Sequence, residues 1–140
     1  MMTDAEFLAA LEACTLDPAQ FRHAAHVRAA YLCLRAGDFV AASARFAAAL
    51  RRFAAHHGQA GRYHETITFA FLAVIGERRA AGGDHGGWAG FAAANPDLLD
   101  ARFLTHYYPP AVLASALARK AFILPGFSPV PHAAPARPQP

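Results

Sequence analysis

The sequence predicts an all-α protein, a single-domain bundle of four main helices followed by shorter C-terminal helices. Of the 140 residues, 55% are hydrophobic and only 16% are charged, which is typical of a globular protein with an alanine-rich interior. Hydrophobic positions recur at helical spacing along most of the chain, and no stretch of appreciable length alternates as a β-strand does. Short connections between successive helices favour antiparallel neighbours.

The first two predicted helices begin at recognisable capping signals. Thr3 and Glu6 have the spacing of a capping box, which predicts a helix over about residues 4–14. Asp17 is a typical N-cap and is followed directly by proline, the residue favoured at the first helical position. The second helix is therefore expected to run from this signal to about Ala36.

Two longer helices and several shorter ones follow. Asp38 is expected to cap a third helix that continues to His57. A fourth helix, over about residues 62–81, is apolar around most of its circumference, so it is expected to be the central and most buried one. Shorter helices are predicted over residues 88–94, 95–105 and 110–122.

The chain is expected to form one domain in the cytoplasm. The helical pattern covers residues 1–124, whereas six of the sixteen residues in 125–140 are proline, which predicts an extended or disordered tail. No apolar run approaches the ~18 residues of a membrane span, so no membrane partner is expected. The N-terminus lacks the basic and apolar regions of a secretory signal.

The basic residues do not predict nucleic-acid binding, despite a net charge of +3. They fall as isolated pairs, Arg51-Arg52, Arg78-Arg79 and Arg119-Lys120, on separate predicted helices. No aromatic platform or binding motif accompanies them, so a nucleic-acid partner is not expected.

Two polar motifs stand out against the apolar helices. His23 and His26 lie three residues apart, so on a helix their imidazoles project from the same face. His64 and Glu65 open the fourth predicted helix, and His64 is expected to face inward with the apolar stripe. Glu65 is expected either to bind the same ion as the histidines or to accept a hydrogen bond from one of the imidazoles and so fix its orientation.

The leading hypothesis is a mononuclear metal centre between the second and fourth helices. Its ligands are His23, His26 and His64, with Glu65 as a ligand or a general base. Imidazoles and a carboxylate suit a divalent transition metal, namely Fe, Zn, Mn or Cu. With an open coordination position, such a centre predicts an oxygen-using or hydrolytic enzyme acting on a small molecule. Arg28 is expected to orient an anionic group of that substrate, or to pair with Glu65.

Two alternatives use the same residues differently. In the first, a metal-free accessory protein holds a small anionic molecule or a partner peptide in the polar cluster. In the second, the histidines are a polar network in the core of a bundle that forms a homodimer through an apolar face. His57, at the end of the third helix, and His106, in the C-terminal segment before Tyr107, are further candidates for the cluster.

A set of motifs runs along most of the chain, over about residues 18–125. It comprises F-x-H-x-x-H-x-R from Phe21, Y-H-E-T-x-T from Tyr63, N-P-D-L-L from Asn95, Tyr107-Tyr108, and the segment from Ala118 to Pro125. As a set, the motifs resemble an uncharacterised family of small bacterial all-helical proteins. The resemblance implies the fold and the placing of both histidine motifs in one site. Pro109-Pro110 departs from the capping serine expected of the family, which affects a helix start and not the site.

Overall fold

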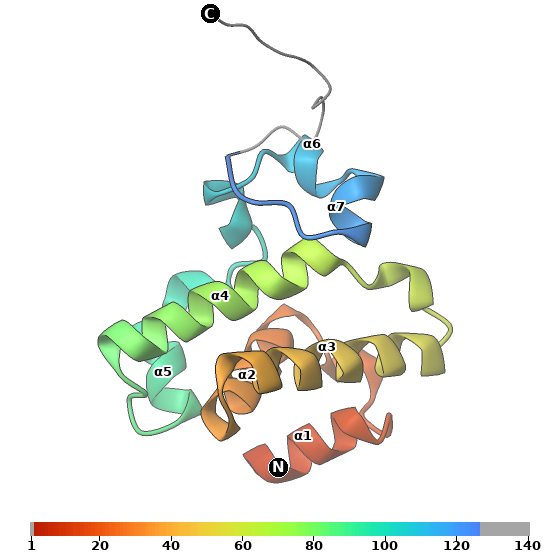
Figure 1. Cartoon of the computed structure of the whole chain (residues 1–140). Coiled ribbons are helices and arrows are strands. Elements are labelled where there is room, and N and C mark those ends of the chain that lie inside the picture. Colours follow the sequence, from red (N-terminus) through yellow and green to blue (C-terminus); the bar gives the residue numbers. More distant parts are fainter. Residues whose placement is uncertain (1, 127–140) are drawn as a thin grey trace, which may run out of the picture.

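The computed structural model describes residues 2–126 and confirms the all-α class (Figure 1). Over these residues it contains seven α-helices and no strand. None of these helices combines the length and the apolar character that a membrane crossing requires. The helices are α1 (Asp4–Glu12), α2 (His23–Ala36), α3 (Phe39–His56), α4 (Glu65–Gly82), α5 (Trp88–Ala94), α6 (Pro110–Leu113) and α7 (Ala116–Lys120). Short 3₁₀ helices lie at Pro18–Gln20, Ala60–Arg62, Pro96–Leu99 and Phe103–His106.

Two of the predicted helix starts are confirmed. At α1, the Glu6 backbone N–H donates to the Thr3 hydroxyl at 3.1 Å, and the Thr3 N–H donates to the Glu6 carboxylate at 2.9 Å. At α3, the Asp38 carboxylate accepts from the Ala41 N–H at 2.8 Å. Each cap supplies partners for backbone donors that the first helical turn leaves free.

The predicted start of the second helix is wrong, because the segment is broken at Phe21 and Arg22. Asp17 caps only the 3₁₀ turn, and Arg22 is extended, with φ −96° and ψ −172°. Phe21 is 9% exposed and packs edge-on against Phe53 of α3, with ring centroids 5.1 Å apart. This tertiary contact outweighs the local preference for a continuous helix, and His23 becomes the first residue of α2.

Later boundaries also differ from the prediction. The fourth helix starts at Glu65, and His64 is its N-cap rather than part of its apolar stripe. The C-terminal segments predicted as single helices over 95–105 and 110–122 are each divided in two. Ser115 divides the second, because its hydroxyl accepts from the Ala118 N–H and so caps α7.

The most central helix is α2, rather than the fourth helix as predicted. It packs against α1, α3, α4 and α5. Seven of its 14 residues are buried, compared with six of the 18 in α4. The face of α4 that points away from α2 is less covered by other segments. The apolar residues around this helix therefore do not indicate a central position.

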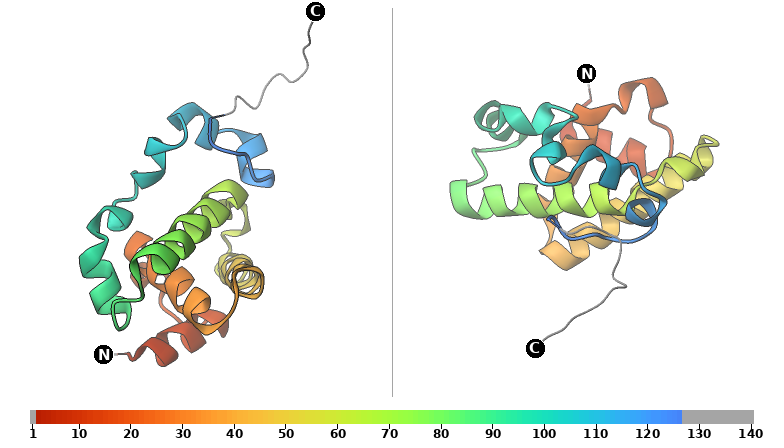
Figure 2. Two further views of the ribbon diagram at one scale, coloured as in Figure 1. Left: turned by 60° about the vertical axis from the view of Figure 1, so that its left-hand side comes forward. Right: turned by 90° about the horizontal axis from the view of Figure 1, so that it is seen from above.

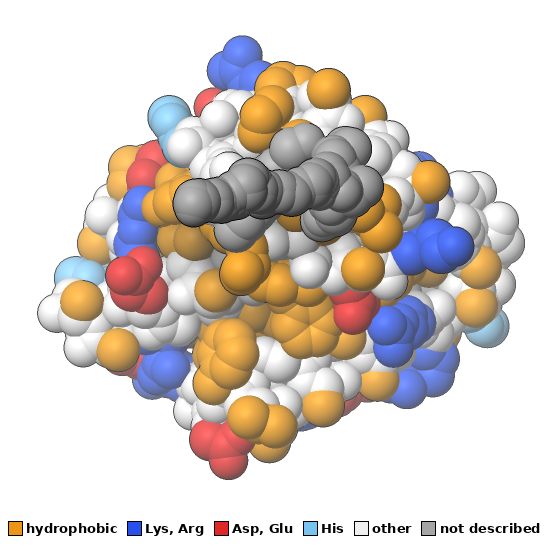
Figure 3. Space-filling model, turned by 45° about the horizontal axis from the view of Figure 1, so that its top comes forward, with side chains coloured by type: hydrophobic (Ala, Val, Ile, Leu, Met, Phe, Trp, Pro, Cys, Tyr) orange, Lys and Arg blue, Asp and Glu red, His pale blue; other side chains and the backbone are white. Residues whose placement is uncertain are grey.

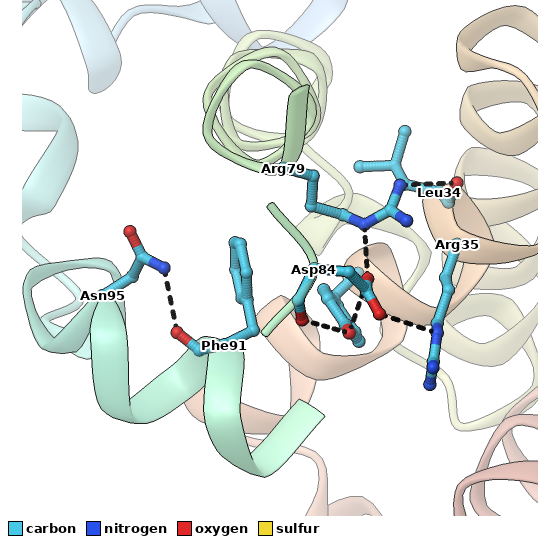
Figure 4. Close-up of polar contacts among 7 residues, drawn as sticks. Leu34, Arg35, Arg79, Asp84, Phe91 and Asn95 are labelled. Carbon is cyan, nitrogen blue, oxygen red and sulfur yellow. Dashed lines mark hydrogen bonds and ion pairs between the residues drawn. The ribbon is translucent and has the colours of Figure 1, made fainter. Parts of the chain in front are cut away.

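The glycine-rich loop between α4 and α5 is held down by Asp84 (Figure 4). Its carboxylate accepts from the Arg79 guanidinium at 2.9 Å and pairs with Arg35 at 3.0 Å. It also accepts from the buried Tyr31 hydroxyl at 2.8 Å. Burial raises the pKa of Asp84, but these hydrogen bonds and the two guanidinium charges lower it by more, and the net shift is downward. The loop is thus bound to α2 and α4.

After α5 the chain runs along one side of the molecule and returns to the N-terminal end of α4 (Figure 2). There the Thr66 hydroxyl donates to the Ala121 carbonyl at 2.7 Å and accepts from the Ile123 N–H at 3.1 Å. The Tyr108 hydroxyl donates to the Ile123 carbonyl at 2.6 Å. These bonds hold the last described residues against α4.

Hydrophobic side chains form a large part of the face that carries α6 and α7 (Figure 3). Tyr107, Leu117, Phe122 and Leu124 of these C-terminal segments are each more than two-fifths exposed. The predicted proline-rich tail lies, from residue 127 on, outside the described residues.

Candidate functional site

A cavity of about 680 Å³ opens between α2, α3 and the start of α4. His23 and His26 line it from α2, and His64 lines it from the N-cap of α4. The two polar motifs therefore face one space, although they are separated by all of α3. His57, which follows the last residue of α3, lines the cavity as well.

His23 is held by a carbonyl from the C-terminal half of the chain. Its Nε2 lies 2.9 Å from the Leu98 carbonyl oxygen, and because a carbonyl can only accept, Nε2 donates. The ring packs against Phe71 of α4, with centroids 5.0 Å apart. The orientation of His23 is thus fixed by α4 and the Pro96–Leu99 turn together.

His26 is an unprotonated imidazole at neutral pH. Its ring stacks on Phe21, with centroids 3.9 Å apart and 17° between the planes. Burial is the main cause that lowers its pKa to about 4, and the charges of His23 and Arg62 act in the same direction. A hydrogen bond with the Phe21 backbone opposes this shift but does not offset it.

His64 uses both ring nitrogens within the protein. Nδ1 accepts from the Ile67 N–H at 3.1 Å and so caps α4. Nε2 donates to the Leu113 carbonyl at 2.8 Å. The residue is 7% exposed, and neither nitrogen is free to bind a metal ion in this arrangement.

The two predicted catalytic residues do not line the cavity. Glu65 accepts from the Tyr63 hydroxyl at 2.7 Å and from Arg51 at 3.1 Å. Arg28 donates to Asp4 of α1 at 2.6 Å, and its guanidinium lies over the Phe7 ring. Asp4, rather than Glu65, is therefore the partner of Arg28.

The structure does not bring the four predicted metal ligands together. His23, His26 and His64 share the cavity, but His64 is fully hydrogen-bonded and Glu65 is directed to Tyr63 and Arg51. Over residues 2–126, no group of three or more His, Cys, Asp or Glu is placed to hold a metal ion.

Arginines at the cavity are the feature that the sequence analysis missed. Arg22 and Arg62 are both exposed and both line it. Within the described chain neither guanidinium makes a hydrogen bond or an ion pair, whereas each of the other arginines of residues 2–126 makes at least one. No Asp or Glu is found among the described residues that line the cavity.

A sequence signal for these arginines does exist. Arg22 immediately precedes His23, and Arg62 lies two residues before His64, so each stands at the N-terminal side of one polar motif.

His57 carries a buried polar atom without a partner. Its Nε2 is inaccessible to solvent and has no hydrogen bond to any described residue. The ring lies beside Phe53, with centroids 4.5 Å apart. His106, the other candidate, packs edge-on against Phe103 and does not line the cavity.

Comparisons of the chain with protein-family models, with curated proteins and with solved structures find no match. The resemblance to a bacterial helical family therefore stays a prediction from the motifs, and the case for function depends on the cavity itself.

Proposed function

We propose that this helical bundle binds a small organic anion in the cavity between α2, α3 and α4, without a metal ion. The observation that carries the proposal is the pair Arg22 and Arg62. Among the arginines of residues 2–126, these are the two whose guanidinium groups make no hydrogen bond or ion pair with a described residue, and both line the same cavity. A guanidinium offers a planar set of donors that matches a carboxylate or a phosphate.

The charge of the lining supports the same conclusion. A divalent cation in this cavity meets two guanidinium groups and no carboxylate among the described lining residues, so its charge is repelled rather than compensated. An anion in the cavity is instead attracted by the same two guanidinium groups. Because Arg22 and Arg62 are exposed, their attraction is screened by salt, and affinity is expected to fall as ionic strength rises.

The test is a calorimetric titration with acetate and with inorganic phosphate, in low salt and with a strong chelator present. The parent protein is expected to bind at least one of these anions saturably. An Arg22→Ala/Arg62→Ala double variant is expected to bind at least tenfold more weakly. Lys120→Ala, which removes an exposed positive charge outside the cavity, serves as the control and should bind as the parent does. Equal affinity in the double variant overturns the proposal.

A second candidate is a transition-metal ion, Fe, Zn, Mn or Cu, held by His23 and His26. One observation favours it: both imidazoles line the cavity one helical turn apart, and His26 is unprotonated at neutral pH, as a metal ligand must be. Elemental analysis of the parent protein and of His23→Ala distinguishes the two candidates. Near-stoichiometric metal that the variant loses supports this candidate, and metal-free protein that binds anions supports the first.

A further inference from the structure

The cavity has an inner extension that is more apolar than its mouth. A smaller space of about 60 Å³ continues from it between α2, α3 and α4. The two spaces share His23, His26 and Phe71 among their lining residues, so they adjoin at the histidine pair. Val27, Ala30 and Phe46 line only the inner space, and all three are at most 3% exposed.

The lining therefore changes from charged to apolar along the cavity. Arg22 and Arg62, at the outer part, are exposed. Phe53 and Phe71, farther in, are less than a tenth exposed, and Phe46, which lines the inner space, is 3% exposed. At the level of the histidines the Thr68 hydroxyl is already engaged, because it donates to the His64 carbonyl at 2.7 Å.

From this gradient we infer that the ligand is a small amphipathic acid, with its anionic group at Arg22 and Arg62 and a compact hydrocarbon group beyond His23 and His26. The inference rests on the proposed anion site and adds the chemistry of the rest of the ligand. An inner space of about 60 Å³ is several times the minimum that one water needs. Six of the nine residues that line it are apolar, and the hydroxyl of Thr68 is already bonded to the His64 carbonyl, so the space favours a hydrocarbon group over water.

The anionic group is either a carboxylate or a phosphate ester, since both fit a pair of guanidinium groups. The hydrocarbon group is compact and unbranched or singly branched, because the inner space is small. Each methylene that leaves water on binding is expected to tighten affinity about fourfold, up to the length at which the inner space is full.

The experiment is a calorimetric titration of the full chain with a matched set of probes: acetate, butyrate, hexanoate, hexyl phosphate, hexanol and hexylamine. Hexanoate is expected to bind at least tenfold more tightly than acetate. Hexanol and hexylamine are expected to bind at least tenfold more weakly than hexanoate. Tighter binding of hexyl phosphate than of hexanoate also supports the inference and identifies the anionic group as a phosphate.

A pair of variants on α2 locates the hydrocarbon group. Ala30→Val fills part of the inner space. It is therefore expected to lower the affinity for hexanoate to about that for acetate, while leaving the affinity for acetate unchanged. Ala24→Val makes the same chemical change at an exposed position of the same helix and should leave both affinities unchanged. If Ala30→Val does not fold, the chain-length series on the parent protein still decides the question.

The outcomes separate the inference from the proposed function. If acetate and hexanoate bind equally and both require Arg22 and Arg62, the amphipathic ligand is wrong and the anion site stands. If hexanol or hexylamine binds as tightly as hexanoate, the anionic group is not recognised and both are wrong. If none of the probes binds, the anion site itself is wrong.

Discussion

The Nε2 atom of His64 donates a hydrogen bond to the carbonyl oxygen of Leu113, 49 residues further along the chain, at 2.8 Å. The same imidazole accepts from the Ile67 N–H through Nδ1 and caps α4. Because Nε2 must carry the proton to donate, the bond to Leu113 fixes the tautomer that the cap requires. One side chain therefore joins the start of α4 to the end of α6.

Replacement of His64 by alanine is expected to lower the free energy of unfolding by about 2–4 kcal/mol, because it removes a helix cap and leaves the Leu113 carbonyl without its partner. Denaturant unfolding followed by circular dichroism measures the loss. His64→Asn is the matched control, since asparagine caps a helix but is too short to reach Leu113, and it should recover about 1 kcal/mol. A fully stable alanine variant contradicts this role.

Stability is expected to fall as the pH decreases from about 6.5 to about 4, because of His26. Its pKa is about 4 in the folded protein and 6.5 when unperturbed, so in this window the unfolded chain binds more protons. The stabilisation that the folded state gains from a neutral His26 is fully present above pH 6.5 and amounts to about 3 kcal/mol at most. Unfolding measured across the window in parent and His26→Gln should show a shallower slope in the variant.

His56→Gln is the control for this pH effect, because His56 is an exposed histidine that does not line the cavity. Its stability profile should run parallel to that of the parent. Parallel profiles for all three proteins show that His26 does not contribute.

Replacement of His57 by leucine is expected to leave the protein at least as stable as the parent. The variant loses a buried nitrogen that has no partner among the described residues, so its free energy of unfolding should stay the same or rise by about 1 kcal/mol. Denaturant unfolding measures the change. His56→Leu, at the neighbouring exposed position, should leave the free energy of unfolding unchanged, and a clear loss of stability in His57→Leu contradicts this expectation.

Thr66→Val is expected to release the segment around Ala121 and Ile123 from α4. The Thr66 side chain is fully buried, and its hydroxyl is the partner of one backbone carbonyl and one backbone N–H. Valine has the same shape but leaves both groups unsatisfied, which should cost about 2–4 kcal/mol. Hydrogen exchange at the Ile123 amide should accelerate, and Thr66→Ser, which keeps the hydroxyl, should retain most of the protection.

The sequence predicted the features of the fold that depend on neighbouring residues. The caps formed by Thr3 with Glu6 and by Asp38 are recognisable because the interacting atoms are three residues apart. The break at Phe21 was not predictable in this way. It depends on the contact with Phe53, and no local signal indicates that this ring turns toward α3.

The candidate site was predicted in part for the same reason. The approach of His23, His26 and His64 to one space followed from two polar motifs on predicted helices. The partners of His64 and Arg28 did not follow, because Leu113 and Asp4 are distant in the sequence. A histidine that binds a metal and a histidine that caps a helix have the same sequence signal, and only the surrounding carbonyls distinguish them.

Most residues that line the cavity come early in the sequence, and this has a consequence for folding during biosynthesis. Apart from Ala101, the residues that line the main cavity lie between Pro18 and Phe71, whereas the bonds that lock His64 and Thr66 end at Leu113, Ala121 and Ile123. Proteins fold from the N-terminus as they leave the ribosome. The cavity can therefore assemble on the nascent chain before the segment from Leu113 onward has been translated. A ligand of the proposed kind that is present during translation is expected to stabilise this intermediate.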